Sequence, residues 1–238
     1  MPTEFDQYSA NYADLLRDPI RDRFTATPDF FHKRKLSILV EFLSQRKMNP
    51  SRMSWLDVGC GQGDLLKIGS SVFARAQGCD PSHEMIKSGS SLQIVEQPSP
   101  TELPFPNESF DLATAVCVYH HVPRERQAAL TASIYKVLKP GGIACVIEHN
   151  PWNPATQLIV KKCPVDWDAQ LLTKSQAAGL LRSVGFRVVD AIYFLYFPER
   201  LFRRAGRLEN LLGKVPFGGQ FALFGIKAAS LMPSRVKD

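Results

Sequence analysis

The chain has 238 residues, of which 45% are hydrophobic and 22% charged, and its formal net charge of +6 comes from 29 Lys+Arg against 23 Asp+Glu. These values exclude a collagen-like, coiled-coil or largely disordered chain, and they fit one large domain or a core with additions. The sequence pI of about 9.1 admits nucleic acid or an anionic membrane as a partner without requiring either.

The cysteines and the apolar segments favour a cytoplasmic location. No apolar run approaches the roughly 20 residues that span a bilayer, and the first residues, MPTEFD, are polar and acidic, unlike a signal peptide. The five cysteines show no CxxC spacing and lie mostly in apolar segments. We therefore expect a cytoplasmic protein with reduced thiols, without a disulfide and without a metal site.

The first 50 residues show the apolar spacing of helices. Aromatic and leucine side chains recur at this spacing from Phe5 to Leu16, and a second apolar face runs from near Pro28 to Arg46. Residues 1–50 are therefore predicted to form an N-terminal helical cap.

Short apolar segments then alternate with helical ones. Helical patterns at 82–88 and 123–138 lie between them, which implies parallel pairing through right-handed crossovers. Five of these segments have the length and composition of strands, namely residues 55–60, 76–80, 92–96, 110–118 and 143–148.

The tail of the chain has a different pattern. A helix is predicted over 174–183 and a strand over 186–197, and a last apolar run at 221–226 follows the turn residues Gly218 and Gly219. The fold class is therefore predicted as α/β, a Rossmann-like open sheet of about seven strands. The sheet is mostly parallel with an antiparallel last strand, and helices cover both faces. Residues 51–238 form its core, in one domain with the cap.

The strongest motif is LDVGCGQGD at residues 56–64, where the first strand meets a helix. Its glycines let the backbone turn sharply and approach a ligand closely, at the edge of a parallel sheet where ligands bind. It fails both registers of the dinucleotide fingerprint GxGxxG, because Asp64 or Leu66 stands where the third glycine is required. Its acidic residues favour a ligand with a cationic centre.

Asp80 closes the second predicted strand, about 20 residues after the glycine loop. A carboxylate at this position can accept hydrogen bonds from both hydroxyls of a ribose. The alternative is an ordinary helix cap or turn residue before Pro81.

These residues resemble the class I S-adenosylmethionine-dependent methyltransferases, of the small-molecule type with a domain similar to methyltransferase domain 11. The glycine loop is similar to their first motif and Asp80 to the acidic residue after their second strand. LPF at 103–105 with Phe110-Asp111 is similar to the segment before their fourth strand, and VLKPGG at 137–142 to the turn into their fifth. The resemblance covers about residues 5–227 and is specific for the cofactor, not for the methyl acceptor.

The resemblance implies S-adenosylmethionine as cofactor and S-adenosylhomocysteine as product. The cofactor-binding residues that it implies are Asp57 near the amino group, Gly59, Cys60, Gly61 and Gly63 in the loop, Asp80 at the ribose, Pro81 and Met85 beside the adenine, Glu102 and Leu103 on its far side, and Cys117 and Val118 near the sulfonium.

Further polar residues lie near the ends of the fourth and fifth strands. His149 is the candidate general base, because the pKa of imidazole lies near neutrality, and the linker residues Asp166 and Asp168 are further candidates. The candidate substrate residues are Tyr12, His120, His121 and Asn150. For each of them, packing against the sheet or at a helix start is the alternative.

We expect methyl transfer to O, N or C of a small molecule, in glycan, lipid or secondary-metabolite biosynthesis. The alternatives are a methyltransferase acting on tRNA or protein, and a non-catalytic cofactor-binding regulatory module. No nucleic acid is expected as a partner, because the predicted cofactor loop is acidic. The linker 149–172 and the insert 198–217 are expected to select the acceptor. The insert mixes five basic residues with leucines, so it can lie on an anionic membrane or be an ordinary surface helix.

Overall fold

The structure is a computed structural model that describes residues 4–27, 29–89 and 92–229. Pro28, near which the second helix was expected to begin, and the outer limits of the two predicted regions, residues 1 and 238, lie outside the described residues. Among the described residues, no helix has the length and apolar content needed to cross a membrane.

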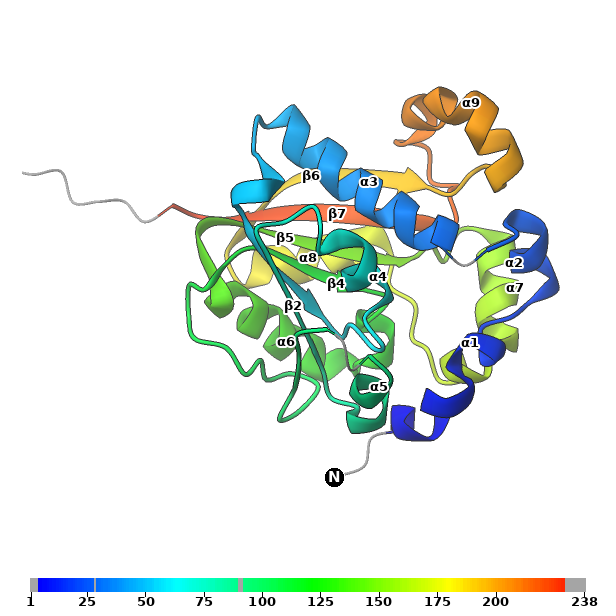
Figure 1. Ribbon diagram of the computed structural model, residues 1–238. Helices are drawn as coiled ribbons and strands as arrows, with labels where there is room; N and C mark the ends of the chain where they lie inside the picture. Colours follow the sequence, from blue (N-terminus) through cyan, green and yellow to red (C-terminus); the bar gives the residue numbers. More distant parts are fainter. Residues whose placement is uncertain (1–3, 28, 90–91, 230–238) are drawn as a thin grey trace, which may run out of the picture.

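A single sheet of seven strands organises the described chain (Figure 1). Its order is β3-β2-β1-β4-β5-β7-β6. The first five strands pair in parallel, and β7 pairs antiparallel with both β5 and β6. The strands are β1 (Ser54–Val58), β2 (Arg75–Asp80), β3 (Ile94–Glu96), β4 (Phe110–Val116), β5 (Leu138–His149), β6 (Phe186–Phe194) and β7 (Gln220–Lys227). The predicted seven-stranded sheet with an antiparallel last strand is confirmed.

The expected turn at residues 139–142 is an irregularity within β5 rather than a gap before it. Phe110 pairs with Leu138 and Leu112 with Ile143, so four residues of β5 are accommodated between successive pairs. Gly141 takes a positive φ of 79°, which glycine adopts without strain.

Helices cover both faces of the sheet, as predicted. The α-helices are α1 (Tyr12–Leu15), α2 (Pro19–Phe24), α3 (Asp29–Gln45), α4 (Asp64–Gly69), α5 (His83–Ser88), α6 (Arg124–Val137), α7 (Pro154–Lys162), α8 (Lys174–Ser183) and α9 (Glu199–Leu212). The 3-10 helices are η1 (Glu4–Asn11), η2 (Pro50–Arg52), η3 (Tyr119–His121) and η4 (Pro164–Asp166). The linker at 149–172 therefore contains a helix, α7, that the sequence analysis did not assign.

Side chains alternate along the central strands between two apolar layers. Ala144 and Val146 of β5 face the cluster under α6 and α8, whereas Ile143, Cys145 and Ile147 face the cluster under α3 and α4. In the second cluster the rings of Phe42 and Phe224 stack with centroids 3.7 Å apart. Because α3 packs on the sheet itself, only the first part of the predicted cap lies off the sheet. The division at residue 50 stays a prediction.

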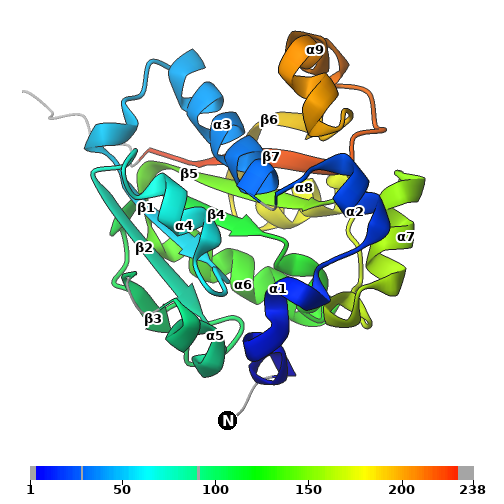
Figure 2. The same cartoon turned by 45° about the vertical axis from the view of Figure 1, so that its right-hand side comes forward.

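The cap helices η1, α1 and α2 lie at the edge of the sheet where the parallel strands end, with η1 beside α5 and α2 beside α7 (Figures 1 and 2). Three contacts fix η1 there. Gln62 Nε2 donates a hydrogen bond to the Ser9 carbonyl (2.9 Å), Ser82 Oγ donates to the Asp6 carboxylate (2.7 Å), and the ring of Phe5 packs edge-on against His121. The cap is therefore anchored to the loops that follow β1, β2 and β4.

The helix predicted in the insert at 198–217 forms as α9 and packs near α3 and β6 (Figure 2). A buried ion pair joins it to α3, with Arg34 Nη2 2.6 Å from Glu209 Oε1. The Arg34 guanidinium also lies over the ring of Phe202, 4.1 Å from its centroid. The outer face of α9 stays exposed, so this helix is both anchored to α3 and amphipathic.

Candidate functional site

The glycine loop at residues 59–63 adopts a backbone that other residues rarely take. Gly59, Gly61 and Gly63 have φ angles of +65°, +54° and +77°. A Cβ on Gly59 would lie 2.6 Å from the Val118 side chain, and one on Gly63 would lie 2.4 Å from Leu92. Gly59 and Gly61 line a cavity, whereas Gly63 supports the loop from behind. Glycine is thus required both for the turn and for the close approach of neighbouring segments.

Two carboxyl groups lie beneath this loop. Asp80 accepts hydrogen bonds from the backbone N–H of Gly61 (2.7 Å) and of Ser82 (2.8 Å), and burial raises its pKa to about 6. Asp57 accepts a hydrogen bond from the hydroxyl of Thr114 (2.5 Å), and burial raises its pKa to about 7. Both groups hold acidic oxygens in a site where a cationic ligand would be stabilised.

The loop opens into a cavity of about 630 Å³ at the carboxyl ends of the strands. Cap residues close it from above, and α7 and the end of β7 bound it on another side. The predicted residues that line it are Tyr12, Asp57, Gly59, Cys60, Gly61, Asp80, Pro81, Met85, Cys117, Val118, His120, His121, His149 and Asp166. Sequence positions as far apart as 12 and 149 therefore share one cavity.

Several lining residues were not predicted. His32 and Lys35 reach the cavity from α3, and Gln97 and Pro100 reach it from the segment after β3. Burial, reinforced by the charge of Lys35, lowers the pKa of His32 to about 4. The helical periodicity of α3 marks its apolar face, but nothing local in the sequence shows that its first turns overhang a cavity.

Glu102 and Leu103 do not line the cavity, so their expected contact with the cofactor stays a prediction. The side chain of Glu102 is exposed, and Leu103 packs against the apolar cluster under α6. The bend after Gln97 brings Gln97 and Pro100 to the cavity instead.

Asn150 also departs from its expected role as a substrate residue. It is fully buried and does not line the cavity. Its Nδ2 donates to the carbonyls of Pro216 (3.0 Å) and Gly218 (2.8 Å), and its Oδ1 accepts from Trp152 N–H (3.1 Å). With its amide group bonded in this way, Asn150 joins the loop after β5 to the turn before β7.

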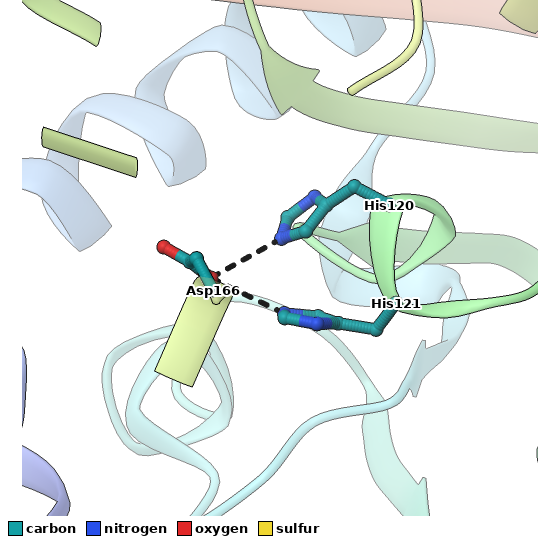
Figure 3. Close-up of side chains that lie close together, drawn as sticks. All are labelled: His120, His121 and Asp166. Carbon is teal, nitrogen blue, oxygen red and sulfur yellow. Dashed lines mark ion pairs between the residues drawn. The ribbon is translucent and has the colours of Figure 1, made fainter. Parts of the chain in front are cut away.

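The histidines after β4 form a cluster with Asp166 (Figure 3). His120 Nδ1 lies 2.5 Å from Glu148 Oε2, and the other oxygen of Glu148 accepts from Val118 N–H (3.0 Å) and Tyr119 N–H (2.7 Å). Asp166 Oδ1 lies 3.6 Å from His120 Nε2 and 3.4 Å from His121 Nε2.

The charges of this cluster depend on one another. Burial by itself disfavours a charged imidazole, but Glu148 and Asp166 hold the pKa of His120 well above its usual value. Burial lowers the pKa of His121, and the two histidines hold the pKa of Asp166 low. Without another cation, His120 is therefore the protonated member. Asp168, the other linker carboxylate, does not line the cavity.

His149 lies on the cavity beside Cys117 and has its ring centroid 5.2 Å from that of His120. Burial alone would raise the pKa of the Cys117 thiol, but the Lys35 ammonium and the His149 imidazole outweigh burial and lower it to about 7. For the second lining thiol, Cys60, burial, reinforced by the charges of Asp57 and Asp80, raises the pKa well above the usual value.

Comparison with known proteins gives one family match, to the methyltransferase domain, over residues 56–146. The chain is 31% identical to tRNA (carboxymethyluridine(34)-5-O)-methyltransferase of Arabidopsis thaliana over 65% of this chain and 36% of that protein. It is 28% identical to ubiquinone biosynthesis O-methyltransferase of Paraburkholderia phymatum over 66% of this chain and 80% of that protein. The first listed tRNA-modifying relatives are thus matched over only 29% to 54% of their length.

Solved structures share the fold over nearly the whole chain. A SAM-dependent methyltransferase from Thermotoga maritima superposes with a TM-score of 0.66 at 16% identity, covering 94% of this chain and 98% of that one. A methyltransferase solved with the Haloferax volcanii Trm112 methyltransferase activator gives a TM-score of 0.64 at 18% identity, covering 96% and 99%. At these identities the likeness concerns the fold.

Proposed function

The chain belongs to the class I S-adenosylmethionine-dependent methyltransferases, and from this premise we propose that it transfers a methyl group to a small molecule held in the cavity beneath the cap. The observation that carries the proposal is one cavity lined together by the glycine loop, Asp57, Asp80 and a candidate base. Its volume of about 630 Å³ lies in the range of small-molecule sites.

The residues present fit S-adenosylmethionine. The backbone of Gly59 and Gly61 is exposed to the cavity, where a Cβ on Gly59 could not be accommodated. Asp57 would face the amino group of the cofactor and Asp80 its ribose hydroxyls. Pro81 and Met85 would flank the adenine, with Gln97 and Pro100 in place of the expected Glu102 and Leu103. Two buried acidic groups suit a ligand that carries positive charge.

When bound, the cofactor supplies a methyl group already activated on a sulfonium, so the protein contributes mainly position and exclusion of water. We propose that the cap residues Phe5 and Tyr12 exclude water, and that His149 accepts a proton from a hydroxyl of the acceptor. His120 is unsuited to that task while Glu148 and Asp166 keep it protonated.

An RNA acceptor is the second candidate. It is favoured by the names of the tRNA-modifying relatives and by the net charge of +6. The cap argues for the small molecule, because it closes over the cavity and leaves less room for a base that remains part of a polynucleotide.

Calorimetry with S-adenosylhomocysteine tests the cofactor site. Asp80→Ala should weaken binding at least roughly tenfold, since it removes a hydrogen-bonded charged partner. Glu96→Ala is the matched control, because Glu96 ends the neighbouring strand in register with Asp80 but is exposed. Equal affinities for wild type and Asp80→Ala, in proteins with unchanged circular dichroism, would contradict the ribose assignment.

The acceptor is tested by incubating the enzyme with methyl-tritiated S-adenosylmethionine and an extract of cells that lack the gene. We expect the label in the fraction below about 1 kDa, the size range that a cavity of this kind encloses. Label that is retained with RNA and released by ribonuclease would replace the small molecule with RNA. Cofactor binding without label in any fraction would identify a non-catalytic module.

We further propose that the outer face of α9 and the turn after it contact an anionic membrane. Leu208, Leu211 and Phe217 are 53%, 78% and 62% exposed, and Arg200, Arg204 and Arg207 are exposed on the same segment. An apolar stripe flanked by arginines is the pattern of interfacial helices.

Flotation with vesicles of phosphatidylglycerol and phosphatidylcholine tests this contact. The wild type should float with the anionic vesicles, less so at high salt, and Leu211→Glu with Phe217→Glu should abolish flotation. Val95→Glu, an exposed apolar residue on β3, is the control and should float like the wild type. Flotation that neither salt nor the α9 substitutions reduce would refute the proposal.

A further inference from the structure

Three side chains converge on one point of the cavity wall. His120 and His121 follow β4, and Asp166 ends η4 in the linker, 45 positions later. Their ligand atoms all lie within 4.8 Å of one another, and the close-up shows both rings turned toward the carboxylate (Figure 3). The fold, not the local sequence, brings them together.

One nitrogen of this cluster has no hydrogen-bond partner among the residues that the structure describes. His120 is 2% exposed, and its Nε2 lies 3.6 Å from Asp166 Oδ1, beyond hydrogen-bond distance. A buried nitrogen without a hydrogen-bond partner lowers the stability of the folded protein unless a further group occupies the space beside it. The atom is directed at the other two members of the cluster.

The opposite side of the same ring is held firmly. Its Nδ1 lies 2.5 Å from Glu148 Oε2, and Glu148 is fully buried and fixed by two backbone N–H groups. A carboxylate that accepts the Nδ1 proton of a histidine fixes the tautomer in which Nε2 presents a lone pair. This carboxylate–histidine arrangement is the one that orients metal-binding imidazoles.

We propose that His120 Nε2, His121 Nε2 and the Asp166 carboxylate bind a divalent transition metal, for which zinc is the best match. Two imidazoles and one carboxylate form a typical three-residue zinc set that leaves a fourth position open. At a Zn–N bond length near 2.05 Å, ligand atoms of a tetrahedral site lie about 3.3 Å apart. The two distances to Asp166 Oδ1, 3.4 and 3.6 Å, are close to that spacing, and the two imidazole nitrogens lie within 4.8 Å of each other.

The open position faces the cavity, because all three residues line it. An oxygen or nitrogen of a small molecule could occupy that position, and a zinc ion would favour its deprotonated form. This last step rests on the proposed methyl transfer, whereas binding of the metal does not. The proposed site is built from histidines and a carboxylate, whereas the expectation of no metal site was drawn from the cysteine spacing.

Cobalt(II) is the probe of choice, because its visible absorption reports the ligand geometry without any turnover. After removal of metal with a chelator, the full chain should bind one Co²⁺ with the intense visible bands of a four-coordinate site, and Zn²⁺ should displace it. His121→Gln and Asp166→Asn should abolish the spectrum. Glu148→Gln should weaken the affinity by about 10- to 100-fold, since it alters only the group that orients His120.

Matched controls separate metal loss from misfolding. His83→Gln removes the histidine of another histidine–carboxylate pair, which is exposed and does not line the cavity, and should leave cobalt binding intact. Each variant is checked by its metal-free melting temperature. A cobalt spectrum with a thiolate charge-transfer band that Cys117→Ser removes would contradict the nitrogen and oxygen ligand set.

The proposal fails if the wild type binds no stoichiometric cobalt or zinc up to millimolar concentration, or if His121→Gln and Asp166→Asn bind as tightly as the wild type. Either result would leave the three residues as a proton-sharing cluster. Because no cofactor is present in the titration, failure of the metal site is distinguishable from failure of the proposed methyl transfer.

Discussion

Cys117 occupies an unusual position at the residue scale. Its backbone has a φ of +57°, a conformation that L residues with a side chain rarely adopt. This conformation follows directly after β4 and sets the thiol at the cavity, where Gln220 Nε2 lies 3.4 Å from Sγ. Strain of this kind persists when the surroundings determine it, so we regard the position of the Cys117 thiol as a feature of the site.

Alkylation with iodoacetamide at pH 7.5 should modify Cys117 at least about tenfold faster than Cys60, because the thiolate is the reactive form. Both thiols are half-buried and line the same cavity, but the pKa of Cys117 is lowered to about 7 while that of Cys60 is raised. Peptide mass spectrometry over time measures the two rates. Cys117→Ser should remove the fast phase, and equal modification of both thiols would contradict the argument.

The buried carboxylate of Asp57 should lower the free energy of unfolding at neutral and higher pH, because burial disfavours its charged form. The pKa of Asp57 is about 7 in the folded protein, against an ordinary value of 3.8. Its contribution to the free energy of unfolding is therefore fully present below pH 4 and is lost as the pH rises to about 7. Asp57→Asn, whose Oδ1 can still accept from Thr114, should therefore raise the melting temperature on the order of 5 °C at pH 8.

The gain from Asp57→Asn should shrink as the pH falls from 7 toward 4, because the folded wild type then takes up the proton. Thermal melts at pH 5, 6.5 and 8 test this sign. Asp64→Asn is the control, since Asp64 is half-exposed in an ion pair with Lys67 and should change little. A gain that grows toward low pH would show that burial does not dominate at Asp57.

Strand ends could be predicted from the sequence, but side-chain directions could not. The glycine loop and Asp80 are local signals, and both lie where expected. Asn150 also lies at the predicted edge, yet its amide is directed to Pro216 and Gly218. Gln97 reaches the cavity through a bend that no periodicity indicates.

At the element scale, a buried ion pair joins α9 to α3, beside the apolar packing of Phe202. Arg34 of α3 and Glu209 of α9 are 6% and 2% exposed, and Glu209 also accepts from Tyr196 N–H (3.2 Å). The insert was recognised from its arginines and leucines, but its attachment could not be, because the two partners are 175 positions apart. By contrast, α7 has a proline at its start and an Asn153 cap, which are local signals of a helix in the linker 149–172.

Glu209→Ala should destabilise the protein by about 3–5 kcal/mol, since it leaves the buried Arg34 charge without its anion. Urea unfolding measures the change. Replacing both partners, Arg34→Met with Glu209→Leu, should recover most of that loss.

Asp29→Ala provides the matched control on α3, because its pair with Lys33 is 68% and 66% exposed. Removing it should change the free energy of unfolding by less than about 1 kcal/mol. A similar small effect for Glu209→Ala would mean that water reaches Arg34 in solution and that α9 is loosely attached.

At the scale of the whole molecule, the site lies between the well-buried sheet and the lightly packed cap segment of residues 5–24. None of residues 5–24 is buried, whereas β4 and β5 contribute many fully buried side chains. The cap nonetheless supplies Phe5, Tyr12, Leu16, Ile20, Arg21 and Phe24 to the cavity. We expect the cap to open when a ligand enters, because elements with few buried contacts open at low free energy.

Hydrogen exchange should show this division directly. In the free protein, amides of α1 and α2 should exchange at least roughly a hundredfold faster than those of β4 and β5, because opening the cap exposes little apolar surface. S-adenosylhomocysteine should slow exchange in η1 and α1, since a bound ligand favours the closed cap. α8, on the far face of the sheet, should be unaffected. If the cap amides were as protected as those of β5 in the free protein, ligands would enter by another route. If exchange slowed equally in α8 and α1 when the ligand is bound, the ligand would stabilise the whole protein instead of closing the cap.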